Sequence, residues 1–259
     1  MEIKAKDMEI AYGAQIIVPE MDIHIDKQEI TTIIGPNGSG KSTVLKALTR
    51  LIKHKSGTVQ LDGINLSDYK AKILSRRIGV LPQIHTAPAD FRVKELVGYG
   101  RMPHQGMFAG HSEADMEIID RAMQMTGVHH LRDKSIYEVS GGERQRVWIA
   151  TVLTQQPEIL FLDEPTTYLD ISHQYDTMRL IRQLNRETGI GVVMVLHDLS
   201  HALEVSDRII IIKDGKKYSE GRPSEVITSE MLREVWGVRG NIINIDGREK
   251  PLIVFEELA

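Results

Sequence analysis

The chain has 259 residues, enough for one large α/β domain or two modest ones. Its apolar fraction of 41% and charged fraction of 26% are ordinary for soluble globular proteins, and its net charge of −4 argues against a nucleic-acid partner, which a basic surface would attract. Cysteine is absent, which excludes disulfides and thiolate metal sites, and no run approaches the roughly 20 apolar residues of a membrane span.

The first third of the chain alternates between strand and helix patterns. The opening ten residues alternate charged and apolar side chains and lack the apolar core of a signal peptide, so we expect the protein to stay inside the cell. A helix over Ser42–Leu51, with leucines at helical spacing, follows a glycine-rich turn. Strands are predicted over Glu2–Tyr12, Met21–Ile25, Glu29–Ile34, Gly57–Leu61 and Ile78–Leu81.

A helical block follows, and the strand–helix alternation then returns. From about residue 93 to residue 155 the apolar period is that of helices, as in Met116–Met125. Strands alternating with helices predict an α/β fold with a mainly parallel sheet, into which the helical block is inserted as a subdomain. The later elements are strands over Ile159–Leu162, Val192–Leu196 and Arg208–Ile212, helices over Ile171–Arg186 and Leu199–Val205, a helix-like Glu225–Trp236 and a strand-like Leu252–Phe255.

A phosphate-binding loop stands between the third strand and the first helix. The segment fits the pattern G-x-x-x-x-G-K-S/T in the strand–turn–helix context that the pattern requires. Its glycines let backbone N–H groups surround a phosphate, Lys41 can reach the β- and γ-phosphate oxygens, and Ser42 can bind Mg²⁺. The alternative is a glycine-rich turn without function. The candidate nucleotide-binding residues are Gly35, Pro36, Asn37, Gly38, Ser39, Gly40, Lys41, Ser42 and Thr43.

Two carboxylates follow a strand in the second half of the chain. Four apolar residues precede Asp163 and Glu164, which places both acids at the carboxyl end of a strand, where open α/β sheets bind ligands. Asp163 is suited to hold Mg²⁺, and Glu164 is suited to act as the general base that polarises the attacking water. The alternative is a strand that ends in a solvated acidic turn.

The segment from Val139 to Arg146 narrows the range of nucleoside triphosphatases. A serine followed by two glycines at the start of a helix forms a second anion site, and it is also the pattern of an N-capped helix with Ser140 as the cap; both can hold. The segment resembles the signature of the ATP-binding cassette (ABC) family, usually L-S-G-G-Q. In that family the second site serves ATP bound to the opposite subunit, which implies ATP binding in trans by Ser140, Gly141, Gly142 and Glu143.

Four further positions match the family by order and spacing. Tyr12 matches the aromatic that stacks on adenine, and Gln83 the glutamine that senses Mg²⁺ and the attacking water. Asp170 matches the loop that crosses the dimer interface, and His197 the histidine that contacts the γ-phosphate; a satisfied histidine at a strand end is the alternative for His197. The departures are Val139 in place of leucine and Glu143-Arg144 in place of glutamine, where we expect altered affinity rather than lost function.

The resemblance implies a fold, an activity and partners. It implies a P-loop NTPase (RecA-like) core, an N-terminal antiparallel β subdomain and an inserted α-helical subdomain. The division is a single domain over 1–259, with a core of 1–85 and 159–221, a helical part of 86–158 and a C-terminal segment of 222–259. It implies an ATPase that uses ATP and Mg²⁺, with Glu164, His197 and Gln83 as catalytic residues and Ser42, Gln83 and Asp163 around the metal. The implied partners are a second copy of the chain in a head-to-tail dimer, integral membrane permease subunits that hold the protein at the cytoplasmic face of the membrane, and, indirectly, a solute-binding lipoprotein.

Three further segments, less specific than the motifs above, indicate a subfamily. Gly100-Arg101-Met102-Pro103-His104, together with the segments Leu169–Gln174 and Arg144–Ala150, resembles ATPases of iron–siderophore, haem and cobalamin importers. Sugar importers often add a long C-terminal domain, and we expect none here. We expect a ferric siderophore as the solute, with haem or cobalamin import, or a cytosolic ATPase of iron–sulfur cluster assembly, as alternatives.

The loop after Gln83 and several histidines and cations are also assigned roles. In the family a groove beside the Gln83 loop receives a short helix of the membrane subunit, and Ile84–Arg92 offers apolar Ala87, Pro88 and Phe91 for that contact; the alternative is an ordinary loop with Phe91 packed into the helical block. Structural or surface roles, rather than metal binding, are expected for His104, His111, His129 and His130, and solvated charge for Arg76, Arg77, Lys216 and Lys217.

Overall fold

The chain folds into two compact units, which we describe separately. The computed structural model describes residues 2–88, 90–106, 110–245 and 250–258. The first unit combines residues 1–66 with 193–259, and the second unit is the continuous segment 67–192. Strands and helices occur in both units, so the α/β fold class predicted from the sequence is confirmed.

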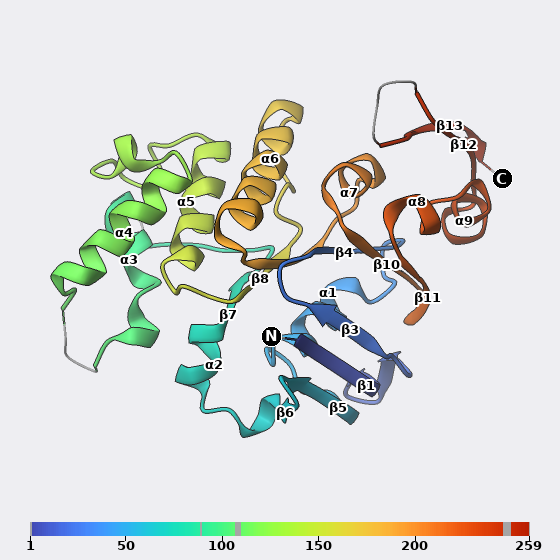
Figure 1. The fold of residues 1–259 in the computed structure, drawn as a ribbon, viewed down its shortest axis with the longest axis horizontal. Coiled ribbons are helices and arrows are strands. Elements are labelled where there is room, and N and C mark those ends of the chain that lie inside the picture. The colour runs from blue at the N-terminus through green and yellow to red at the C-terminus, as the bar shows by residue number, and fades with distance from the viewer. Residues whose placement is uncertain (1, 89, 107–109, 246–249, 259) are drawn as a thin grey trace. The chain divides into compact units, whose positions relative to one another are not determined.

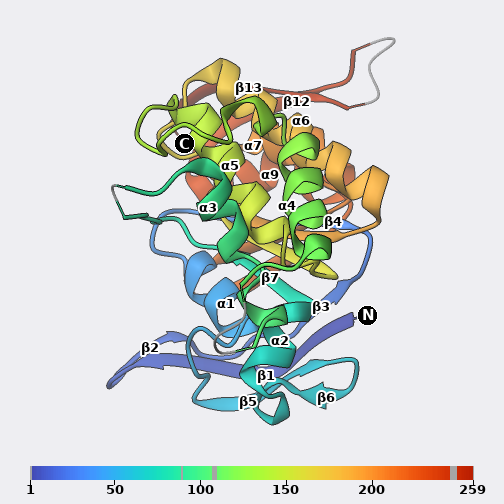
Figure 2. The same ribbon diagram turned by 90° about the vertical axis from the view of Figure 1, so that its left-hand side faces the viewer.

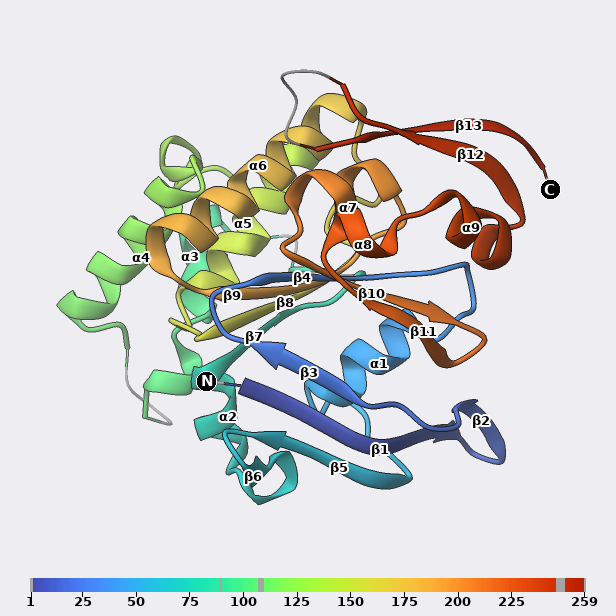
Figure 3. The same cartoon turned by 45° about the vertical axis from the view of Figure 1, so that its right-hand side comes forward.

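An antiparallel sheet forms the N-terminal part of the first unit. Strand β1 (Glu2–Tyr12) pairs antiparallel with three neighbours, and β5 also pairs with β6 (Figure 3). In the first half of β1 the side chains of Ile3 and Ala5 are buried while those of Lys4 and Lys6 are not, the period-two alternation of a half-buried strand. The predicted antiparallel subdomain is therefore present. Its other strands are β2 (Gln15–Val18), β3 (Ile23–Asp26), β5 (Ser56–Leu61) and β6 (Ile64–Asn65).

The first unit also contains the strand that leads into the phosphate-binding loop. All five residues of β4 (Ile30–Ile34) are buried, and this strand pairs in parallel with β10 (Arg208–Lys213). Strand β10 pairs antiparallel with β11 (Lys216–Gly221). The end of β9 (Gly191–Val195) lies beside β4, where the Leu196 N–H donates to the Ile33 carbonyl at 3.2 Å. The helices here are α1 (Lys41–Leu48) and α7 (Leu199–Val205).

The C-terminal part of the first unit differs from the sequence prediction. A single helix over Glu225–Trp236 is wrong, because the backbone is extended at Ile227 and Thr228 starts a new helix by accepting the Met231 N–H at 3.1 Å. The elements are α8 (Pro223–Val226), α9 (Ser229–Met231), a π-helical turn (Leu232–Trp236) and an antiparallel hairpin of β12 (Val238–Ile243) and β13 (Leu252–Leu258), seen at the C-terminus in Figure 3.

The second unit joins two parallel strands to a group of helices. Strand β7 (Ile78–Leu81) pairs in parallel with β8 (Ile159–Asp163), whose residues are all buried. Three helices that lie far apart in the sequence pack on one another, α3 (Val93–Tyr99), α4 (Glu113–Met125) and α5 (Gly141–Leu153), as Figures 1 and 2 show. They form the predicted helical subdomain. The remaining helices are α2 (Ala71–Arg77) and α6 (Ile171–Thr188), with 3-10 turns at Met102–His104 and His129–Leu131.

A buried ion pair holds the helical subdomain together. Arg101 Nε donates to Asp115 Oδ1 at 2.7 Å, and its Nη1 donates to the Thr154 carbonyl at 2.7 Å and to Gln156 Oε1 at 3.0 Å. The exposed fractions of the two charged side chains are only 6% and 11%. The segment Gly100–His104, singled out in the sequence as a mark of a subfamily, therefore serves to fasten α4 to the end of α5.

Some charged and histidine side chains of the second unit make specific contacts. Arg77 is not simply solvated, because it pairs with Glu158 at 2.6 Å and lies over the ring of Tyr69. His104 Nε2 lies 2.8 Å from the Gln155 carbonyl oxygen. Within the described residues, no metal-binding group of three His and carboxylate side chains involves His104, His111, His129 or His130.

No helix in the described ranges is long and apolar enough to span a membrane.

Candidate functional site

The phosphate-binding loop of the first unit wraps around its own lysine. Lys41 is 5% exposed, and its Nζ donates to the carbonyl oxygens of Gly35 at 3.0 Å and Pro36 at 2.9 Å. The Ser39 N–H donates to the Pro36 carbonyl at 3.2 Å, which closes the turn. The loop thus folds as the sequence pattern predicts, between β4 and α1.

Two glycines of this loop are required by the backbone. A Cβ on Gly35 would lie 2.0 Å from the Ile212 carbonyl oxygen, so no side chain fits where β4 ends. Gly40 has a φ of 98° in the left-handed region and precedes the first residue of α1. The tight turn between β4 and α1 therefore depends on these two glycines, and a turn of this kind at the start of a helix is the arrangement that binds phosphate.

The other candidate residues of the first unit lie at the ends of strands. Tyr12 is the last residue of β1 and is 50% exposed. His197 follows β9 and precedes Asp198, whose carboxylate accepts the His201 N–H at 2.8 Å and caps α7. The roles of Tyr12 toward adenine and of His197 toward the γ-phosphate stay predictions.

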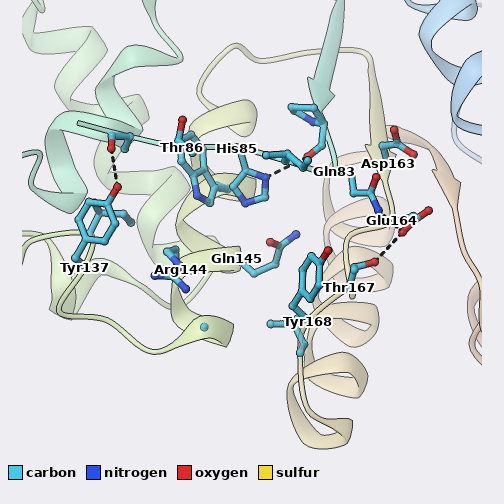
Figure 4. Close-up of a pocket in the computed structure, with 17 residues that line it drawn as sticks. Gln83, His85, Thr86, Tyr137, Arg144, Gln145, Asp163, Glu164, Thr167 and Tyr168 are labelled. Atoms are coloured by element: carbon cyan, nitrogen blue, oxygen red, sulfur yellow. Dashed lines mark hydrogen bonds between the residues drawn. The ribbon is translucent and has the colours of Figure 1, made fainter. Parts of the chain in front are cut away.

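In the second unit the structure brings Gln83 and Glu164 together. Gln83 Nε2 donates to Glu164 Oε2 at 2.6 Å, and the Thr167 hydroxyl donates to the same oxygen at 2.9 Å (Figure 4). Glu164 has a φ of 55°, an uncommon backbone conformation for a residue with a side chain, directly after the buried Asp163. The strand end thus presents one buried carboxylate and one oriented carboxylate, and Thr167, three residues after Glu164, was not singled out from the sequence.

A cavity of about 290 Å³ opens beside this pair within the second unit. Gln83, Glu164 and Tyr168 lie on one side of it, and His85 and Tyr137 on the other (Figure 4).

Aromatic contacts form the side of the cavity on which His85 and Tyr137 lie. The His85 ring meets the Trp148 ring edge-on with centroids 4.7 Å apart, and burial lowers the pKa of His85, so that its ring is neutral near pH 7. The Tyr137 hydroxyl donates to the Ala87 carbonyl at 2.8 Å. The cavity therefore combines the polar groups around Glu164 with aromatic side chains.

The loop after Gln83 is only partly as exposed as the sequence suggested. Ile84 is 79% exposed and Pro88 is exposed, but Ala87 is half-buried. Phe91 packs on Tyr99 of α3 with ring centroids 5.1 Å apart, as the simpler alternative for this loop expected. Residue 89, within the predicted segment Ile84–Arg92, lies outside the described residues.

The Ser140 turn begins α5 as a capped helix. The Ser140 hydroxyl accepts the Glu143 N–H at 3.3 Å, and the Glu143 carboxylate accepts the Ser140 N–H at 2.8 Å. These bonds to Ser140 hold the pKa of Glu143 below its usual value. The cap predicted for Ser140 is therefore present, and the side chain of Glu143 serves it; binding of ATP in trans by this turn stays a prediction.

Asp170 caps α6 in the same way. Its Oδ1 accepts the His173 N–H at 2.9 Å and the Ser172 hydroxyl at 2.9 Å. The contact of Asp170 across a dimer interface stays a prediction.

The family model described as "ABC transporter" matches residues 18–167, more than half of the chain. The chain belongs to the ABC transporter family. As an ABC transporter ATPase domain it binds and hydrolyses ATP, and its phosphate-binding loop lies in the matched range.

Curated ABC transporter proteins match nearly the whole chain. The ferric enterobactin transport ATP-binding protein FepC of Escherichia coli (strain K12) is 43% identical over 97% of this chain and 93% of its own length. The iron(3+)-hydroxamate import ATP-binding protein FhuC of Bacillus subtilis (strain 168) is 40% identical over 99% and 95%, and the petrobactin import ATP-binding protein FpuC of Bacillus anthracis is 40% identical over 96% and 91%.

Solved structures of ABC transporter cassettes share the fold. A dimeric bacterial ABC transporter cassette has a TM-score of 0.74 and 30% identity and covers 85% of this chain and 98% of its own. The structure of cbiO1 from Clostridium perfringens, part of the transporter complex cbiONQ, has a TM-score of 0.77 and 28% identity over 89% and 92%. The P-loop NTPase fold expected from the sequence is thus confirmed.

Proposed function

We propose that this chain is the ATP-hydrolysing subunit of an importer of ferric siderophores. The observation that carries the proposal is the similarity to three proteins named for import of ferric enterobactin, iron(3+)-hydroxamate and petrobactin, each at 40–43% identity over at least 91% of both chains. Two of the three names state ferric iron together with an organic ligand, and the third names petrobactin. In such importers the solute contacts other subunits, so no residue of this chain selects it.

The first unit binds the triphosphate. The N–H groups at the start of α1 and the Lys41 ammonium, which the Gly35 and Pro36 carbonyls already hold in the loop, receive the β- and γ-phosphates. Tyr12 stacks on the adenine, and His197 contacts the γ-phosphate.

The second unit supplies the base. Glu164 accepts the proton of the attacking water, and the donors on Gln83 and Thr167 hold its carboxylate in one orientation. A general base must be held within hydrogen-bond reach of its water, and two donors to one carboxylate oxygen favour such a fixed position.

The residues present fit a Mg²⁺ ion. Mg²⁺ prefers oxygen ligands, and Ser42, Asp163 and Gln83 offer a hydroxyl, a carboxylate and an amide oxygen. The ion neutralises charge on the phosphates when bound. These residues would hold the ion, and Glu164 would remain available for the water.

Two copies of the chain act together, each contributing a Ser140–Gly142 turn to the nucleotide of the other. Backbone N–H groups at the start of the 13-residue helix α5 form a site for negative charge. A structure similar to this chain is itself described as dimeric. Permease subunits hold the dimer at the cytoplasmic face of the membrane, and the exposed Ile84 and Pro88 beside the Gln83 loop are where a permease segment docks.

Uptake measurements test the proposal. Cells that lack this gene are complemented with wild type, Glu164→Gln or the control Glu187→Gln, which changes an exposed glutamate of α6. We expect uptake of an iron-labelled ferric siderophore only with wild type and the control. Undiminished siderophore uptake in the deletion, with loss of haem or cobalamin uptake instead, would reject the solute and leave the ATPase activity in place.

A further inference from the structure

The starts of α5 and α6 are joined by a side chain that the sequence did not single out. His173 lies in the first turn of α6, and its ring lies against Gly142 in the first turn of α5. A Cβ built on Gly142 would lie 1.5 Å from His173 Cδ2 and 2.6 Å from both Cγ and Nε2. Not even the methyl group of alanine fits at position 142 while the ring keeps this place.

The backbone at Gly142 does not itself require glycine. Gly142 lies within α5 and is not among the residues with positive φ, so alanine would be the better residue for the helix. Within this chain, the feature that excludes a side chain is the approach of the His173 ring.

One carboxylate oxygen fixes the orientation of that ring. His173 Nδ1 lies 2.8 Å from Asp170 Oδ1, the oxygen that also accepts the His173 N–H and the Ser172 hydroxyl. The backbone bond from His173 and the bond from Ser172 hold the pKa of Asp170 below its usual value, so the carboxylate is ionised near pH 7 and can only accept. Nδ1 therefore carries the proton that this contact shares.

One ion pair also joins the same two helices, and Leu169, just before α6, lies near the start of α5. Leu169 Cδ2 lies 3.9 Å from the position of a Cβ on Gly141. One turn further along, Arg146 Nη2 lies 3.2 Å from Asp176 Oδ2. Helices α5 and α6 lie side by side in the second unit (Figure 1), so the Ser140–Gly142 turn and the loop that ends at Asp170 are held as one body.

We infer that His173 is a positioning residue for the anion site of the Ser140–Gly142 turn. By holding Gly142 against Asp170, it orients the N–H groups of Gly141 and Gly142 toward the terminal phosphate of a nucleoside triphosphate. Through the same contact, the turn and the loop after Glu164 move together. The inference rests on the proposed function of that turn.

Five full-length variants test it. His173→Ala removes the ring and the donor, whereas His173→Asn keeps a donor at the place of Nδ1 and an atom at the place of Cδ2, the ring atom nearest Gly142. Gly142→Ala displaces the ring, and the double variant Gly142→Ala/His173→Ala tells whether the ring is the reason for the glycine. His129→Ala, a partly exposed histidine of the same unit, is the control.

The expected kinetic result is a loss of turnover without a loss of nucleotide binding by the separate chain. We expect kcat to fall about 10-fold in His173→Ala and Gly142→Ala, the order of a misplaced electrostatic contact. In His173→Asn, which keeps both atoms of the contact, kcat should stay within about threefold of wild type. The dissociation constant of MgATP for the monomer should stay within about twofold, because the phosphate loop binds it. The kcat of the double variant should also fall only about 10-fold, since two changes to one contact are not additive.

A double variant whose kcat falls about 100-fold would overturn the inference, because the two residues would then act independently. A kcat of His173→Asn as low as that of His173→Ala would overturn it too, since the atoms of the contact would then not be what sustains turnover. Thermal unfolding separates this outcome from failure of the proposed function: Gly142→Ala should lower Tm in the wild-type background but raise it by about 2–4 °C in the His173→Ala background. That comparison holds even if the wild type hydrolyses no ATP.

Discussion

Replacing Arg101 should destabilise the protein far more than replacing an exposed cation of the same helical subdomain. The change Arg101→Ala removes hydrogen bonds to Asp115, Thr154 and Gln156 at 2.7, 2.7 and 3.0 Å and leaves the Asp115 carboxylate buried without its cation. Removing one partner of a buried ion pair costs about 3–5 kcal/mol of the free energy of unfolding. Part of the Asp115 carboxylate stays satisfied, because Oδ2 accepts from the Ser112 N–H and hydroxyl at 3.0 and 2.9 Å.

The matched control is Lys94→Ala, which breaks an ion pair of the same 2.7 Å length to Asp133. The side chains of Lys94 and Asp133 are 36% and 61% exposed, and such exposed ion pairs contribute about 0–1 kcal/mol to the free energy of unfolding. Urea unfolding followed by circular dichroism, without nucleotide, measures both variants. A loss below about 1 kcal/mol for Arg101→Ala, equal to that of Lys94→Ala, would refute the reasoning from burial.

The ion pair between Arg101 and Asp115 also makes the free energy of unfolding depend on pH. The hydrogen bond from Arg101 holds the pKa of Asp115 well below its ordinary value of about 3.9. A carboxyl whose folded-state pKa is depressed contributes stability that is fully present above the unfolded pKa and is lost as pH falls toward the folded one. The difference in free energy of unfolding between wild type and Arg101→Ala should therefore be constant from pH 5 to 8 and become smaller below about pH 4. A difference that grows in acid would contradict this assignment.

Three further outcomes are expected. Glu164→Gln should bind MgATP but release phosphate about 10²–10⁴-fold more slowly, because an amide cannot accept the proton of the water; near-normal release would transfer the role of base to another group. Lys41→Ala should weaken nucleotide binding about 10–100-fold in equilibrium dialysis, since a charged donor to the phosphates is lost, and unchanged affinity would exclude that contact. Gly100→Ala should lower the free energy of unfolding by about 1–3 kcal/mol, because its Cβ would lie 1.9 Å from the Thr151 carbonyl oxygen and 2.0 Å from Thr154 Oγ1; urea midpoints equal to wild type would show that the backbone yields without cost.

Local patterns predicted the elements that carry the candidate site. The strand–loop–helix around Lys41 and the strand before Asp163 follow from apolar runs beside glycines or acids, and the cap at Ser140 follows from a serine three residues before a glutamate. Each of these signals lies within about ten residues, so a single sequence contains all of it. The family resemblance placed Gln83 and Glu164 near the same attacking water, but it did not predict the hydrogen bond between them.

Contacts between distant segments could not be predicted in this way. Nothing local shows that Arg101 pairs with Asp115 rather than with another acid, or that the ring of His173 excludes a side chain at Gly142. Strand β11 was missed because Lys216–Gly221 is mostly polar and has no buried residue, so it lacks the apolar alternation of a half-buried strand. The break at Ile227 was missed because Thr228 acts as a cap inside an otherwise helical pattern.

The discontinuous first unit has a consequence for synthesis of the protein. Strand β4, which leads into the phosphate-binding loop, is joined at its first residue to a partner 177 positions later, where the Ile30 N–H donates to the Asp207 carboxylate at 2.8 Å. At 5–20 residues per second, about 9–35 s pass between the appearance of these two residues on the ribosome. The continuous second unit is complete by residue 192, so it can pack first. We therefore expect a nascent chain to acquire its nucleotide site only in the last part of translation, when β10 reaches β4.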